Sequence, residues 1–184
     1  NNVLTFAPDG ISSSAGDVNV PFERDAQGRI TKITYPAGKN YIYGYDVAGD
    51  LETVTFPSVT LPDNSQQAIV LRYGYYPDHF FKEATDPRGN RPVITTYDSA
   101  GRIESVTDVA GNQTVYEYDP ATRTTIIHYV GDPANPDDDL GDITLVYDEA
   151  GYLTSYINSL DEQTIYSYNP NHNLTKIRDP LTNE

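Results

Sequence analysis

Tyrosines and other apolar residues alternate with polar residues in several short stretches of the chain. Tyrosine recurs at every second position in three of them, over residues 41–45, 116–118 and 166–168. Ile42, Val115 and Ile165 occupy positions of the opposite parity. Because successive side chains of a strand point to opposite faces, this period of two predicts β-strands with two distinct faces.

A second kind of stretch has its apolar residues three positions apart. The pairs are Ile30 and Ile33, Leu51 and Val54, Ile103 and Val106, and Leu174 and Ile177. The stretches are too short for helices and are bounded by turn sequences, so we expect strands here as well. Either a β-bulge or a strand partly buried on both faces would explain the spacing, and the sequence leaves both open.

Turn sequences separate these stretches at regular intervals. The first kind is Asp-x-x-Gly, in which Asp bonds backbone groups ahead of it and Gly adopts a positive φ. It occurs at residues 25–28, 46–49, 98–101 and 148–151, and a second kind of turn occupies residues 36–40, 86–90 and 108–112. The chain therefore reads as strand, turn, strand, turn throughout.

An internal repeat organises these elements. Its marker is the Asp of a Tyr-Asp pair, or the residue in its place, at Asp25, Asp46, Tyr76, Asp98, Asp119, Asp148 and Asn169. Most steps are about 21 residues, and two are about 30 residues. The two long steps contain insertions rich in Pro, Asp and Asn, at residues 56–64 and 131–139, which we expect to be loops.

About seven such units predict an all-β fold, a curved or spiralling antiparallel sheet that is open and solenoid-like. Residues 1–20 lack the repeat and are expected to form an N-terminal lead or cap. Residues 21–184 are expected to form the repeat array, a single domain. The chain has no Met, not even an initiator, and we expect it to be a piece of a longer polypeptide.

The cleanest unit runs from Tyr97 to Asp119, with the sequence YDSAGRIESVTDVAGNQTVYEYD. It resembles the YD repeat, also called the RHS repeat, and the resemblance extends over residues 21–184. The family includes bacterial polymorphic toxins, cocoon-forming subunits of toxin complexes, wall-associated proteins and teneurins. The resemblance implies a spiralling β-shell and a non-catalytic structural role in a large secreted or cell-surface protein, and such repeats are also associated with carbohydrate binding.

Two departures from the family's toxin shells limit this resemblance. The self-cleaving end of those shells has a C-terminal core with an Asp-Pro-x-Gly motif, whereas Asp86-Pro87-Arg88-Gly89 is here an ordinary turn of a repeat. An array this short is expected to be an open sheet rather than a closed container.

The composition of the chain disfavours several classes of binding partner. The net charge is −15, with 27 acidic against 12 basic residues, so nucleic acid and anionic lipid are disfavoured. No apolar run reaches the roughly 20 residues of a membrane span. The chain has no Cys, which excludes disulfides and thiolate metal sites. We expect an extracellular segment whose partners are the rest of its parent polypeptide and a polysaccharide or cell-surface glycan.

The third unit is the most altered and is the candidate carbohydrate site. It places six aromatic or imidazole side chains within nine residues: Tyr73, Tyr75, Tyr76, His79, Phe80 and Phe81. Exposed aromatic rings stack on sugar rings, but tyrosines on one face of a strand commonly pack within the sheet. A degenerate turn repacked with aromatic residues is therefore the competing interpretation.

The second insertion is a candidate Ca²⁺ site, because carboxylates are hard oxygen ligands. Its acidic residues are Asp132, Asp137, Asp138, Asp139 and Asp142, and a merely solvated acidic loop is the alternative. No catalytic residues are predicted. The three histidines are far apart in sequence, and no nucleophile-elbow or phosphate-binding motif is present. We therefore expect a structural scaffold, with carbohydrate binding as the alternative and an enzyme disfavoured.

Overall fold

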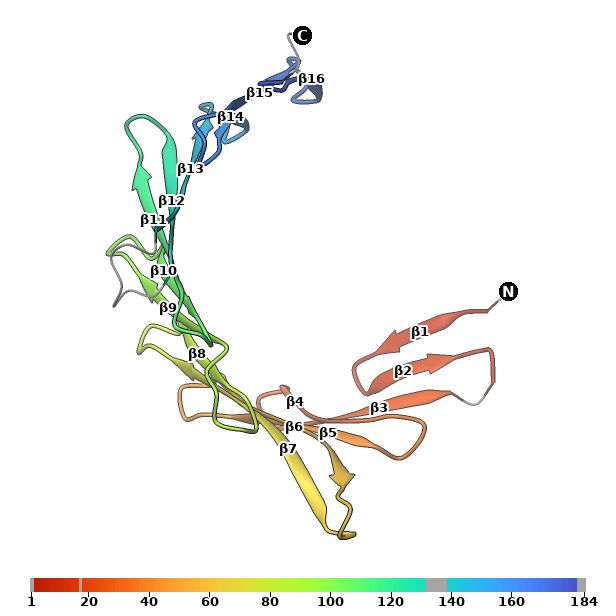
Figure 1. Cartoon of the computed structure of the whole chain (residues 1–184). Coiled ribbons are helices and arrows are strands. Elements are labelled where there is room, and N and C mark those ends of the chain that lie inside the picture. Colours follow the sequence, from red (N-terminus) through yellow and green to blue (C-terminus); the bar gives the residue numbers. More distant parts are fainter. Residues whose placement is uncertain (1, 17, 132–138, 182–184) are drawn as a thin grey trace. The chain divides into compact units, whose positions relative to one another are not determined.

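The computed structural model describes residues 2–16, 18–131 and 139–181, and this part of the chain consists of strands joined by turns (Figure 1). The chain divides into two compact units, Asn1–Pro92 and Val93–Glu184. Within each unit, every strand pairs antiparallel with the next strand in sequence. The predicted all-β, antiparallel repeat fold is confirmed. Within the described residues, the structure contains no helix long and apolar enough to cross a membrane.

The first unit contains eight strands. They are β1 (Leu4–Ala7), β2 (Gly10–Ser13), β3 (Asn19–Arg24), β4 (Ile30–Thr34), β5 (Asn40–Tyr45), β6 (Leu51–Thr60), β7 (Gln66–Tyr75) and β8 (Phe81–Thr85). Strands β1 and β2 lie in the residues expected to form a lead or cap, and β2 pairs with β3. The division into residues 1–20 and 21–184 stays a prediction.

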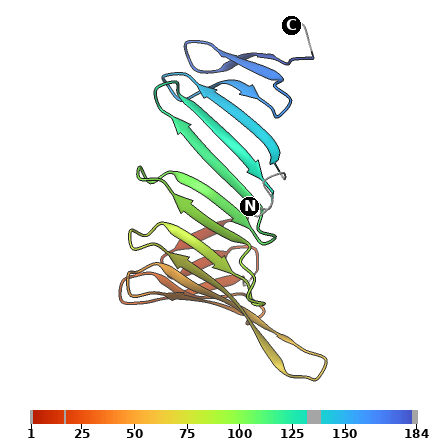
Figure 2. The ribbon, with the colours of Figure 1, turned by 60° about the vertical axis from the view of Figure 1, so that its left-hand side comes forward.

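The second unit also contains eight strands, which follow one another in a single layer (Figure 2). They are β9 (Val93–Tyr97), β10 (Ile103–Asp108), β11 (Gln113–Asp119), β12 (Thr124–Val130), β13 (Asp139–Tyr147), β14 (Leu153–Ile157), β15 (Gln163–Tyr168) and β16 (Leu174–Arg178). These strands include the two tyrosine-bearing stretches and the two spacing-of-three stretches predicted for this half of the chain, in β11, β15, β10 and β16.

Eleven turns in the described chain share one hydrogen-bond pattern. The N–H of the fourth residue donates to the carbonyl of the first, and the N–H of the first donates to the carbonyl of the fifth. The turns begin at Asp25, Tyr35, Asp46, Leu61, Tyr76, Asp86, Asp98, Asp108, Asp148, Asn158 and Asn169. The fourth residue has a positive φ throughout, which suits Gly. In four turns Asn64, His79, Asp161 or His172 adopts it instead, so the altered units keep the same turn.

A β-bulge accounts for the apolar spacing of three. Ile103 pairs with Tyr97 and Ser105 pairs with Thr96, which leaves Glu104 without an opposing residue. One extra residue puts Ile103 and Val106 on the same face. The same irregularity recurs in every strand of this class, where the unopposed residues are Thr31, Glu52, Lys82, Glu104, Thr154 and Thr175.

In each unit, the strand register separates a tyrosine face from a polar face. The tyrosine face carries, in the first unit, Ile33, Tyr41, Tyr43, Val54, Leu71, Tyr73 and Tyr75, and in the second Val106, Tyr116, Tyr118, Ile127, Leu145, Tyr156 and Tyr166. The polar face carries hydroxyl and amide pairs such as Thr96 with Ser105 and Ser155 with Gln163. Among the described hydrophobic residues only Val54 is buried, at 8% exposure.

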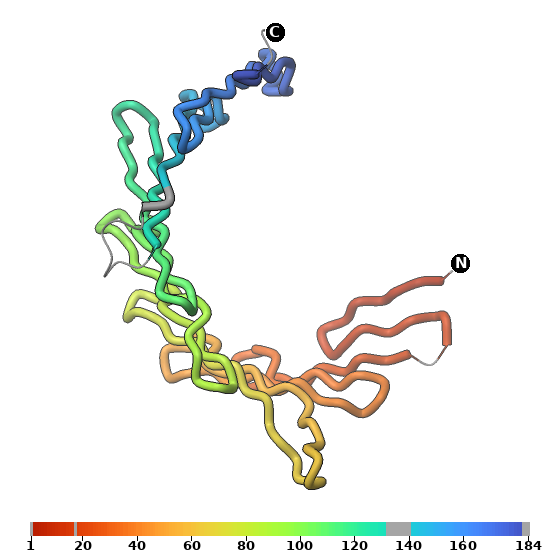
Figure 3. Tube along the Cα trace, viewed as in Figure 1, coloured from red at the N-terminus to blue at the C-terminus, as the bar shows by residue number. Residues whose placement is uncertain are grey.

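The prediction that residues 56–64 form a loop was wrong. Strand β6 continues through Thr60, and only the turn Leu61–Ser65 separates it from β7 (Figure 3). Phe56 pairs with Ile69 and Val59 with Gln67, so the insertion lengthens a hairpin. A register shift between Phe56 and Val59 accommodates Pro57, which cannot donate to a ladder. The other insertion lies largely outside the described residues.

Candidate functional site

The structure brings three of the six predicted carbohydrate-site residues together. Tyr73, Tyr75 and Phe81 lie on the tyrosine face at the junction of β7 and β8. The ring centroid of Phe81 lies 6.4 Å from that of Tyr73 and 6.0 Å from that of Tyr75. The Tyr75 hydroxyl donates to the carbonyl oxygen of Leu51 at 3.0 Å. All three side chains are half-buried, so they pack on one another while one side of the cluster stays accessible.

The other three residues, Tyr76, His79 and Phe80, form the turn between β7 and β8. His79 takes the positive-φ position, and its Nδ1 lies 2.9 Å from Oδ2 of Asp50 in a neighbouring turn. Asp50 stands at the fifth turn position, where Arg29 and Arg102 instead pair with the first Asp of their own turns. His79 thus bonds the carboxylate that takes the place of the arginine in the Asp46–Asp50 turn.

The Tyr-Asp and Gly-Arg residues of the repeat form a joint structural cluster. Tyr118 at the end of β11 donates its hydroxyl to the carbonyl of Ile103 at 2.8 Å. The Arg102 guanidinium lies 4.4 Å from the centroid of that tyrosine ring and pairs with Asp98 at 2.7 Å. Burial raises the pKa of Tyr118 above its ordinary value. The arrangement recurs where Tyr45 meets Ile30 and Arg29, and the tyrosine–carbonyl bond recurs between Tyr168 and Leu153.

The first Asp of each turn is held by local hydrogen bonds. Oδ1 of Asp86 accepts from the N–H groups of Arg88 and Asn90, and Oδ2 accepts from the Asn90 side chain. The Asn90 side chain contributes most to lowering the pKa of Asp86, and the backbone N–H groups add to it. Asp108 has the same partners in its own turn and a lowered pKa. These carboxylates act as turn formers.

The predicted metal ligands are only partly described. Asp132, Asp137 and Asp138 lie outside the described residues, and Asp139 begins β13. Asp142 lies on the polar face, where its Oδ1 is 2.8 Å from Nδ1 of His128. In the described ranges, no group of three His, Asp or Glu residues has an arrangement that could hold a metal ion. Ca²⁺ binding by the insertion therefore stays a prediction.

One cluster was missed by sequence reasoning. His128 on β12 lies between Asp142 on β13 and Glu117 on β11, with Nε2 at 3.5 Å from the glutamate Oε2. Each ring nitrogen faces a different carboxylate, so the two carboxylates do not converge on one point. The three residues are far apart in sequence, and only the strand register brings them together.

The repeat can now be compared with known families. The family model described as RHS Repeat matches residues 24–58, 97–133 and 138–184. The chain belongs to the RHS repeat family. The matched ranges lie in both units and include the clusters around Tyr45 and Tyr118, whereas residues 59–96, with the cluster of Tyr73, Tyr75 and Phe81, lie outside them. No curated protein matches the chain at a significant level.

A solved structure shares the fold of this RHS repeat chain. It is described as the crystal structure of TcdB2-TccC3-Cdc42 and has a TM-score of 0.67 and 18% sequence identity. The comparison covers 94% of this chain and 10% of that one. A second, TcdB2-TccC3 without its hypervariable C-terminal region, has a TM-score of 0.46 and 15% identity over 89% of this chain and 10% of its own. The chain thus spans about a tenth of the length of these proteins.

Proposed function

We propose that the chain is a non-catalytic wall segment of a large secreted protein, in which its RHS repeats form part of a shell. The observation that carries the proposal is the pair of unlike faces on a single layer of strands. A sheet normally buries its apolar face against another layer. Here Tyr43, Leu71, Tyr116 and Leu145 are only half-buried within their own units.

The turn and tyrosine residues support the same proposal. The distinctive residues of the repeat bond to one another or to backbone groups, as in the cluster of Asp98, Arg102 and Tyr118. They build the sheet and leave no converging set of reactive groups on the described faces. The acidic net charge of −15 suits a surface facing solvent outside the cell.

Oxidative footprinting tests this function by comparing the isolated chain with the complete polypeptide that contains it. We expect Tyr43 and Tyr116 on the tyrosine face to be oxidised more slowly in the complete polypeptide, because the shell interior covers them. His128 on the polar face serves as the internal control and is expected to react equally in both. Equal oxidation of the tyrosines in both samples would contradict the wall proposal.

Carbohydrate binding is the second candidate function, and the half-exposed cluster of Tyr73, Tyr75 and Phe81 favours it. Phe80, 37% exposed in the adjoining turn, adds a fourth aromatic side chain. Affinity electrophoresis on polysaccharides tests it. Retardation that Phe81→Ala abolishes would support binding at this cluster, and Tyr166→Ala on another part of the tyrosine face is the matched control. Unretarded migration of the folded chain on every polysaccharide would end this candidate.

A further inference from the structure

The lengthened hairpin β6–β7 extends beyond both of its neighbours in the first unit (Figures 1 and 3). On one side, β5 pairs with β6 only as far as Thr55. On the other side, β8 pairs with β7 only from Arg72 to Tyr75. In the described part of the first unit, the outer segments of β6 and β7 therefore pair only with each other, and each has an open backbone edge.

The two open edges are not equally protected against strand pairing. On β6, Pro57 lacks an N–H group and a register shift interrupts the ladder between Phe56 and Val59. Proline and bulges are the devices by which natural sheets block an edge. On β7, the segment Gln66–Leu71 has the sequence QQAIVL, with no proline and no charge, and the extra residue at the register shift lies on β6 rather than on β7. The edge of β7 is thus left ready for pairing.

The hydrogen-bond pattern shows which backbone groups of β7 point outward. The N–H of Leu61 donates to the carbonyl of Ser65 across the β6–β7 turn, and the N–H of Tyr76 donates to the carbonyl of Phe80 across the β7–β8 turn. In an antiparallel pair these groups alternate between the two sides of a strand. Odd-numbered residues of β7 therefore face β6, whereas Gln66, Ala68 and Val70 direct both N–H and C=O outward.

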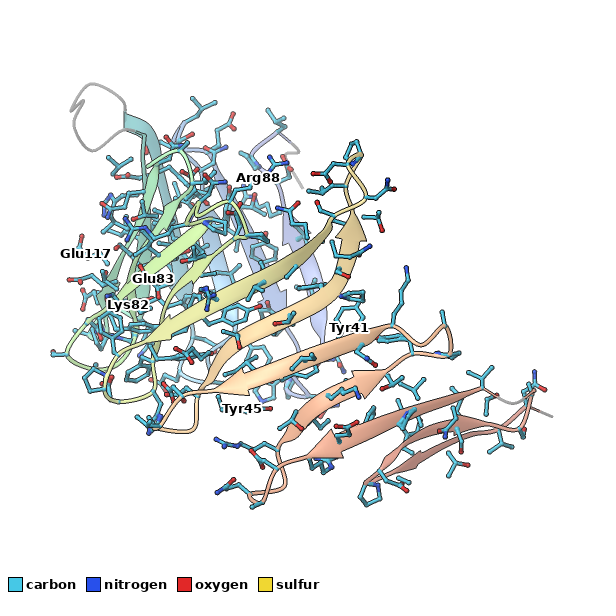
Figure 4. The ribbon with its side chains drawn as sticks, turned by 90° about the horizontal axis from the view of Figure 1, so that it is seen from below. Tyr41, Tyr45, Lys82, Glu83, Arg88 and Glu117 are labelled. Carbon is cyan, nitrogen blue, oxygen red and sulfur yellow. The ribbon has the colours of Figure 1, made fainter. Side chains whose placement is uncertain are left out.

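A groove of about 300 Å³ adjoins this edge, where the turn after β8 approaches β7. Val59, Ala68 and Ile69 supply its apolar lining, and Arg88 lines it from the turn (Figure 4). Arg72, exposed on β7, and Arg88 form no ion pair and no side-chain hydrogen bond within the described chain. The carboxylate of Asp86 is occupied by its own turn. The open edge is therefore flanked by two arginine side chains outside any ion pair, of which Arg88 also attracts the Asp86 carboxylate electrostatically.

We propose that the outer edge of β7 binds an extended acidic peptide segment of a partner protein, which adds as a further antiparallel strand beside Gln66–Val70. Backbone hydrogen bonds to alternate residues supply affinity in this mode of recognition, and side-chain pockets supply selectivity. An apolar side chain of the segment enters the groove beside Val59 and Ile69, and its carboxylates face Arg72 and Arg88. A second copy of the chain fits less well, because edge-to-edge pairing would bring these arginines together.

The test uses the whole chain and a fluorescent peptide of alternating threonine and valine with a glutamate at each end. We expect binding that raises hydrogen-exchange protection at the amides of Ala68 and Val70, while Gln67 and Ile69 change little because they already face β6. Ala68→Pro removes one outward donor and is expected to weaken binding about tenfold. Thr60→Pro on the opposite edge is the matched control and should leave the affinity unchanged.

The peptide itself provides two further controls. N-methylation of alternate amides removes its backbone donors and is expected to abolish binding, and lysine in place of glutamate is expected to weaken it. Arg88→Glu should weaken binding of the glutamate peptide, while Lys39→Glu makes the same charge change in another turn and should not. Absent binding, equal binding of the N-methylated peptide, or unchanged protection at Ala68 and Val70 would overturn the proposal. A dimer that Ala68→Pro dissociates would also overturn it, since the occupant would be a second copy.

Discussion

The tyrosine of the Tyr-Asp pair at the end of β11 contributes a hydroxyl hydrogen bond as well as a packed ring. Tyr118 donates to the Ile103 carbonyl at 2.8 Å, whereas Tyr116, two residues earlier on the same face, forms no hydroxyl hydrogen bond within the described chain. Tyr118→Phe keeps the ring beneath Arg102 and leaves that carbonyl without its donor. We expect the free energy of unfolding in urea to fall by about 1 kcal/mol.

Tyr116→Phe is the matched control for this effect. It removes the same atom from the same strand and face, and we expect the unfolding free energy to change by less than about 0.5 kcal/mol. Equal losses in the two variants would show that the hydroxyl bond to Ile103 is not what distinguishes the repeat tyrosine.

The fourth position of each turn requires a residue that can adopt a positive φ. Gly151 has a φ of 86° and a Cβ added there would meet no atom within 4 Å, so Gly151→Ala isolates the backbone effect. We expect this variant to lose roughly 1 kcal/mol of stability, because a left-handed conformation is costly for residues with a side chain. Asp161 adopts a φ of 60° at the equivalent position. Asp161→Gly is expected to gain about 0.5 kcal/mol, and thermal unfolding of both variants measures the contrast.

At the scale of the strand, the bulge determines which side chains of each spacing-of-three strand lie on the tyrosine face. Val54 pairs with Tyr43 and Leu71 on that face, whereas Glu52 is the unopposed bulge residue and is exposed. Val54→Ala should cost roughly 2 kcal/mol through lost burial and the resulting cavity. Glu52→Ala should be nearly neutral. Chemical unfolding of the two variants tests the assignment, and a larger loss for Glu52→Ala would contradict it.

Strand and turn identity could be predicted from the sequence because both depend on local signals. Alternating tyrosines fixed the faces of β5, β11 and β15, and Asp-x-x-Gly located the turns. The spacing of three did not distinguish a bulge from a doubly buried strand, since both produce the same sequence pattern. The insertion at residues 56–64 was misassigned because Pro57 and the Asp and Asn residues resemble a loop, while Pro57 sits at a bulge within β6.

Most of the side-chain clusters could not be predicted from the sequence, because they depend on the register in which the strands pair. The pairing of His79 with Asp50 joins residues 29 positions apart in two turns. Glu117, His128 and Asp142 meet only because three strands align on one face. The sequence did locate the aromatic concentration of the third unit. It also indicated a degenerate turn there, with Tyr76 in the place of the marker Asp. It did not indicate that Tyr73, Tyr75 and Phe81 pack on one another on one face of the sheet.

At the scale of the whole molecule, the turn carboxylates make folding sensitive to acid. The pKa is lowered in the folded chain for Asp25, Asp63, Asp86, Asp98, Asp108 and Asp119. Below the ordinary Asp value of about 3.9, the unfolded chain binds more protons than the folded chain. The stabilisation from these groups is therefore fully present above that value and is lost as the pH falls through the lowered folded values.

Two natural turns suggest how to separate this effect from general acid unfolding. Asn158 and Asn169 take the place of the turn Asp, and their side-chain oxygens accept the same backbone N–H bonds without titrating. Replacing Asp86 and Asp108 together by Asn should therefore preserve both turns and flatten the fall of the unfolding free energy as the pH drops below about 4. Glu149→Gln replaces an exposed turn carboxylate that pairs with Arg123 at 3.9 Å, and it should leave the slope unchanged. A slope that Asp86→Asn with Asp108→Asn does not alter would show that the acid sensitivity arises elsewhere in the chain.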